Sequence, residues 1–123
     1  MWVLGFLALV MLSGACGDGG SGPSNPPLTA AAIEVGDDFF RSGRNSTEDP
    51  AVDTLAVNGT VTWTWAADSR THSVQSLTGP GFADSEELAG GESRYEVTLT
   101  TPGTYEYDCG VHGGTMTGRI IVR

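Results

Sequence analysis

Residues 109–116 read CGVHGGTM and place Cys109, His112 and Met116 within a single short segment. The chain has one other histidine, His72, which lies far earlier in the sequence. Thiolate, thioether and imidazole groups are soft or borderline ligands that bind transition metals. Glycines occupy most of the intervening positions, and they let a chain bend tightly enough for three side chains to face one ion. The segment therefore predicts a metal site completed by a distant histidine.

Copper fits this set of ligands better than zinc does. A blue-copper site uses two imidazoles and one thiolate in a plane, with a weak axial thioether. The sequence therefore predicts one copper ion with four ligands: His72, Cys109, His112 and Met116. Structural zinc sites use further Cys or His ligands instead of a thioether. A catalytic thiol is a weaker alternative, because the sequence shows no oxyanion hole and no third orienting group beside Cys109 and His112.

Each of the four residues also has a purely structural explanation. A lone Cys is among the most often buried residue types, and a Met commonly fills gaps in a core. A histidine at the start of a strand usually faces solvent. Taken together, these explanations require every soft ligand of the folded region to fall in the right position by coincidence. The favoured interpretation is a metal site whose copper ion alternates between Cu(I) and Cu(II).

The elements around these ligands read as β-strands. VTWTW at 61–65 and TYEYDC at 104–109 alternate apolar and polar side chains with a period of two. Strands are expected at 33–35, 55–57, 61–65, 72–76, 94–100, 104–109 and 119–122, with turns at 58–59 and 101–103. Only 84–88 could form a short helical turn. Seven to eight short strands predict an all-β, two-sheet Greek-key sandwich. With one Cys in this region, an inter-sheet disulfide is excluded.

The N-terminal part of the sequence is typical of an exported protein. An uncharged apolar run at 2–12 is followed by small residues, so 1–15 is predicted to be a signal peptide. Cys16 then stands where a bacterial lipoprotein signal would place its lipidated residue; the alternative is an ordinary signal with an incidental Cys. Residues 16–32 are rich in Gly, Ser and Pro, as in a flexible tether. Residues 33–123 form the predicted copper-binding domain.

The charge balance limits the partners. Fifteen acidic residues against six basic ones give a net charge of −9. Nucleic acid is excluded as a partner because its phosphates need basic patches. An acidic surface can steer a basic partner protein toward a site, although it also serves plain solubility.

The segments GTVTWTWAADSRTHSV at 59–74 and GTYEYDCGVHGGTMTGRIIV at 103–122 resemble the cupredoxin superfamily, in its plastocyanin/azurin-like branch. DDFF at 37–40 and LAVNG at 55–59 fit the early strands of the same pattern. The resemblance covers 33–123. It implies a cupredoxin-like Greek-key β-sandwich of about eight strands, with copper near one end held by the four ligands named above. It also implies that the backbone N–H of Ser73, at a position that is often Asn, donates a hydrogen bond to the sulfur of Cys109.

The function implied is that of an exported, monomeric, mononuclear type 1 copper protein that carries one electron between redox partner proteins, for which basic contact surfaces are one option. It would lie on the periplasmic or cell-surface side of a bacterial membrane and contact the membrane through the lipid on Cys16 alone. The alternative is a copper-binding module for storage, buffering or delivery. An enzyme is not expected, because a second copper centre needs further histidines and the sequence has only His72 and His112.

Overall fold

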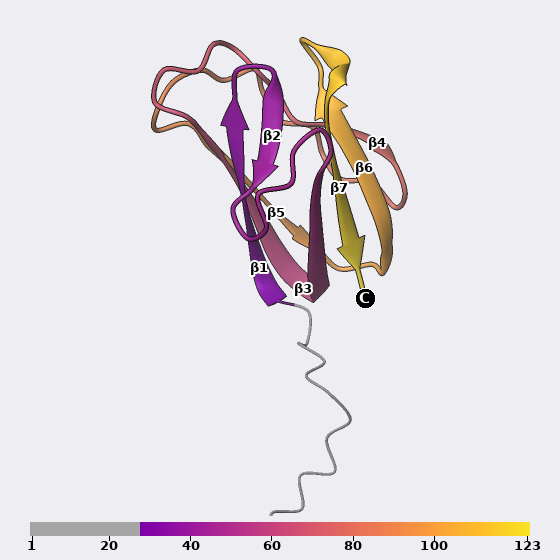
Figure 1. Cartoon of the computed structure of the whole chain (residues 1–123). Coiled ribbons are helices and arrows are strands. Elements are labelled where there is room, and N and C mark those ends of the chain that lie inside the picture. The colour runs from indigo at the N-terminus through magenta and orange to yellow at the C-terminus, as the bar shows by residue number, and fades with distance from the viewer. Residues whose placement is uncertain (1–27) are drawn as a thin grey trace, which may run out of the picture.

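The computed structural model describes residues 28–123, which form seven strands and no helix (Figure 1). The predicted signal peptide, Cys16 and the first part of the predicted tether lie outside the described residues. The strands are β1 Leu28–Gly36, β2 Phe39–Ser42, β3 Ala51–Trp65, β4 Gln75–Thr78, β5 Arg94–Leu99, β6 Gly103–Cys109 and β7 Gly113–Val122. Over this part of the chain, no helix is long and apolar enough to cross a membrane.

The strands form two facing layers that share β3 (Figure 1). The second half of β3 pairs in parallel with β1 and antiparallel with β5, and β2 extends that layer beyond β1. The first half of β3 pairs in parallel with β7, which continues through β6 to β4. The predicted all-β sandwich of seven to eight strands is confirmed, with seven strands in the described part of the chain.

Two local predictions differ from the structure. Asn58 and Gly59 were expected to form a turn between two strands, but both lie inside β3, where Asn58 adopts a φ of +69°. Asn tolerates this left-handed conformation, so the chain bends there without ending its pairing. The helical turn expected at 84–88 is absent; Leu88 pairs instead with His72 through two backbone hydrogen bonds of 2.9 Å.

The folded region also begins earlier than the boundary expected at residue 33. β1 starts at Leu28, and Ala30 to Ala32 pair with Thr60 to Thr62 of β3. Backbone pairing requires no apolar side chain, so a small-residue segment that reads as a tether can still extend a sheet. Residues 28–32 of the predicted tether therefore belong to β1.

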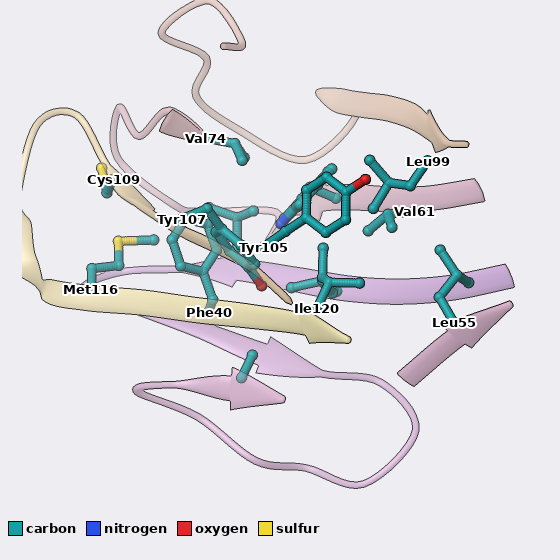
Figure 2. Packing of buried hydrophobic residues seen from close by; sticks show 14 of the residues in the cluster. Phe40, Leu55, Val61, Val74, Leu99, Tyr105, Tyr107, Cys109, Met116 and Ile120 are labelled. Atoms are coloured by element: carbon teal, nitrogen blue, oxygen red, sulfur yellow. The ribbon is translucent and has the colours of Figure 1, made fainter. Parts of the chain in front are cut away.

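Aromatic rings fill the space between the layers (Figure 2). Tyr107 packs edge-on against Phe40 and Trp63, with ring centroids 4.9 Å and 5.3 Å away. Such aromatic pairs each contribute about 0.5–1.5 kcal/mol beyond the area that they bury. Cys109 and Met116 belong to the same fully buried cluster, so two of the predicted metal ligands are packed into the core.

Candidate metal centre

The predicted ligands come from four places in the fold. His72 lies between β3 and β4, in the segment bridged to Leu88. Cys109 is the last residue of β6, and Met116 lies in β7. His112 lies in the turn between these two strands, where its backbone N–H donates to the carbonyl of Cys109 at 3.2 Å. Figure 1 shows this turn at the same end of the molecule as the turn between β1 and β2.

The structure brings three of the four side chains to one point. The Nδ1 atoms of His72 and His112 are 3.1 Å apart. The sulfur of Cys109 lies 3.8 Å from the first of these nitrogens and 3.6 Å from the second. All three ligand atoms lie within 4.8 Å of one another. His72 and Cys109 are fully buried, whereas the side chain of His112 remains 32% exposed.

Met116 lies at the same end of the core. In the β6–β7 ladder, Tyr107 pairs with Gly118 and Asp108 pairs with Thr117. Continued by one residue, this register would set Met116 opposite Cys109, but the ladder shifts there and Cys109 pairs with Gly113. Figure 2 shows both sulfur-bearing side chains toward one end of the cluster, and Met116 is fully buried. Its role as the axial ligand stays a prediction.

Two backbone N–H groups point at the sulfur of Cys109. The N–H of Ser73 lies 3.5 Å from Sγ and the N–H of Val111 lies 3.4 Å from it. The contact from Ser73 is the one that the sequence resemblance implied. The Ser73 hydroxyl also accepts a hydrogen bond from the N–H of Gly110 at 3.0 Å, which ties the ligand loop to the segment that carries His72. These donors offset the negative charge that a metal-bound thiolate carries.

Two carboxylates that sequence reasoning missed complete the site. Asp37 Oδ1 lies 3.0 Å from Nε2 of His72, and Asp38 Oδ1 lies 3.1 Å from Nε2 of His112. The hydrogen bond with His72, followed by one from the backbone of Arg70, lowers the pKa of Asp37. In the sequence, both acids were assigned only to an early strand of the cupredoxin pattern. Two consecutive acids in a short turn between apolar strands were the one available signal.

This geometry fits a bound cation. A carboxylate beside Nε2 favours a proton on that nitrogen, which leaves the lone pair on Nδ1. The two Nδ1 lone pairs would then face each other across 3.1 Å, an unfavourable contact unless a positive charge lies between them. Two imidazoles, a thiolate and a neighbouring thioether form the soft donor set that suits copper. The four residues can hold one copper ion per chain.

Comparisons with known proteins agree with this chemistry. The copper-binding protein family of plastocyanin and azurin matches residues 54–123. A purple cupredoxin from Nitrosopumilus maritimus is 27% identical, with a TM-score of 0.58, over 76% of this chain and 99% of that chain. The oxidised plastocyanin of Dryopteris crassirhizoma is 22% identical, with a TM-score of 0.57, over 76% of this chain and all of the other.

A larger enzyme shares the fold in part. A copper-containing nitrite reductase from Thermus scotoductus is 25% identical, with a TM-score of 0.56, over 85% of this chain but only 24% of that chain. A search of curated protein sequences gives no significant match. The match of the family to more than half of the chain, together with the fold and the gathered donors, shows that this chain is a cupredoxin and belongs to the plastocyanin/azurin family of copper-binding proteins.

Proposed function

We propose that this protein is an exported, mononuclear type 1 copper protein that carries one electron at a time between redox partner proteins. Bound copper would supply the electron-transfer chemistry by alternating between Cu(I) and Cu(II). The observation that carries the proposal is the convergence of Nδ1 of His72, Sγ of Cys109 and Nδ1 of His112 at one end of a rigid sandwich. Met116 is the fourth proposed ligand.

The surroundings of the ligands suit a carrier. His72 is held by two backbone hydrogen bonds to Leu88 and by the carboxylate of Asp37. Cys109 ends a paired strand and receives two backbone N–H groups. Ligands supported in this way stay in place when the charge of the ion changes, which keeps the reorganisation accompanying electron transfer small.

The partly exposed ring of His112 is the proposed point of electron entry and exit. Its neighbour Val111 is 47% exposed, so an aliphatic contact lies beside the imidazole edge. The exposed carboxylate of Asp38 adds negative charge at the same place. We therefore propose a redox partner with a basic contact surface, since complementary charge speeds encounter.

Carrier function is favoured over catalysis and over copper delivery. Both histidines of the sequence lie in the gathered site, which leaves none in this chain for a second histidine-bound copper centre. His72, Cys109 and Met116 are fully buried, and a buried site favours retention of the ion over its release to an acceptor. Export through a signal at 1–15, lipidation at Cys16 and a location at the outer face of a bacterial membrane are proposals that rest on the sequence alone.

The first test is the spectrum of the copper-loaded protein. Adding Cu(II) to the apo-protein should give an intense visible thiolate-to-copper band and a type 1 EPR signal, and Cys109→Ser should lose both. Asp68→Asn, which changes an exposed acid on a loop, is the control and should keep them. A colourless copper complex of the wild-type protein refutes the type 1 site.

A second measurement separates the carrier from a storage or delivery module. A carrier should show a reversible one-electron potential and rapid self-exchange, measured by NMR line broadening in mixtures of the two oxidation states. Slow exchange, together with rapid loss of copper to a competing chelator, would instead support delivery.

A further inference from the structure

The outer nitrogens of the two proposed ligand histidines face consecutive residues. His72 and His112 come from separate segments, yet Asp37 contacts the first ring at 3.0 Å and Asp38 contacts the second at 3.1 Å. The two ring centroids are 4.8 Å apart. One short turn between β1 and β2 therefore holds both imidazoles from the side opposite to the gathered Nδ1 atoms.

The backbone of this turn is built to present both carboxylates. Gly36 pairs with Phe39, so Asp37 and Asp38 are the only residues between the paired positions of β1 and β2. Asp38 has a φ of +67°, a left-handed conformation that Asp and Asn tolerate better than most residues. Asp37 is fixed further by the backbone N–H of Arg70 at 2.8 Å and by its guanidinium at 3.6 Å.

We propose that Asp37 and Asp38 are paired positioning residues of the copper site, an inference that rests on the proposed function. Each carboxylate keeps the proton of its histidine on Nε2 and fixes the ring, so that both Nδ1 atoms face the ion. Each also places negative charge behind a ligand ring, which makes that ring a stronger donor and favours Cu(II) over Cu(I). The turn thus sets both the geometry of the site and its reduction potential.

The two contacts differ in strength. His72 is fully buried, so its Nε2 has no water as an alternative partner and depends on Asp37. Asp38 is 60% exposed and His112 is partly exposed, so water and salt weaken that contact. The loss of Asp37 should therefore disturb the site more than the loss of Asp38.

The apo-protein provides a test that is independent of copper. Asp38→Asn keeps both the left-handed conformation and an oxygen acceptor, whereas Asp38→Gly fits the backbone but removes the acceptor. Nitrogen-15 NMR of the histidine rings should show a larger share of the Nε2–H form of His112 in the wild type and in Asp38→Asn than in Asp38→Gly. The Nδ1–H form should increase several-fold in Asp38→Gly. Unchanged tautomer populations in Asp38→Gly would overturn the positioning role.

The same comparison applies to the buried ring. Asp37→Asn retains an acceptor for His72 and for the N–H of Arg70, and Asp37→Ala removes it. The tautomer of His72 should change in the alanine variant alone. Thermal unfolding of both variants checks that they fold, and a folded alanine variant with the wild-type tautomer would contradict the proposal.

The copper-loaded protein tests the effect of charge. Asp37→Asn should shift the ratio of Cu(I) to Cu(II) affinity at least tenfold toward Cu(I), which corresponds to a rise of about 59 mV in a one-electron potential. Asp38→Asn should shift it about threefold, and the control Asp68→Asn by less than twofold. Equal potentials for all three variants would refute the charge effect. If the wild type forms no type 1 site, the proposed function fails, while the NMR comparison still decides whether the carboxylates position the rings.

Discussion

Gly118 is a position where one added methyl group should clearly damage the fold. It lies in β7 directly opposite Tyr107 of β6. A Cβ at Gly118 would lie 1.9 Å from Cζ of Tyr107 and 2.1 Å from its hydroxyl oxygen. Ordinary carbon contacts are about 3.5–4.0 Å, so the ring would have to move by roughly 1.6 Å or more.

The ring of Tyr107 has little room for such a movement. It is fully buried and packs edge-on against Phe40 and Trp63. Overpacking of a core costs about 1–3 kcal/mol, and a rigid ring held on two sides places Gly118→Ala at the upper end, near 3 kcal/mol. For a domain of this size that corresponds to a fall in Tm of roughly 10–20 °C.

Urea and thermal unfolding of the apo-protein measure this effect. Gly114→Ala is the matched control, because Gly114 lies in the same strand and a Cβ there meets nothing within 4 Å. Its stability should stay within about 1 kcal/mol of the wild type. Combining Gly118→Ala with Tyr107→Leu should recover part of the loss. A Gly118→Ala protein as stable as the Gly114→Ala protein would refute the argument from packing.

Three further predictions concern Asp53, Met116 and Ser73. Burial raises the pKa of Asp53 above 3.8, so the folded state binds the proton more tightly than the unfolded state does. The free energy of unfolding should therefore fall as the pH rises from 3.8 through the raised pKa. Asp53→Asn should lack this part of the pH dependence in urea titrations. Met116→Leu should change apo stability by less than about 1.5 kcal/mol but alter the EPR spectrum of the copper form, whereas an unaltered spectrum would make Met116 core filler. Ser73→Ala should cost about 1 kcal/mol of unfolding free energy by removing the acceptor of the Gly110 N–H, and no loss would contradict that role.

The metal ligands could be predicted from the sequence more readily than the residues that hold them in place. Cys109 and His112 stand out because soft ligands are scarce in the sequence, and alternation around Tyr105 and Tyr107 places Cys109 on the buried face. His72 followed from the absence of any other histidine. These inferences use local pattern and composition, which a single sequence contains.

The contacts of Asp37 and Asp38 depend on how distant segments meet, and no local pattern encodes that. The same reason explains the early start of β1, because Ala30 to Ala32 are strand residues only through their partners in β3. Asn58 and Gly59 carry a true turn signal, but pairing on both sides outweighs it and keeps β3 continuous.

Because β3 belongs to both layers, unfolding of β3 removes backbone pairing from both layers at once. Its first half is hydrogen-bonded to β7 and its second half to β1 and β5, so one continuous strand carries backbone pairing in both layers. The sandwich should therefore unfold in one cooperative step. Hydrogen exchange should therefore show the same global protection for the amides in both halves of β3. The two layers, connected through Asn58, would then form a single cooperative unit.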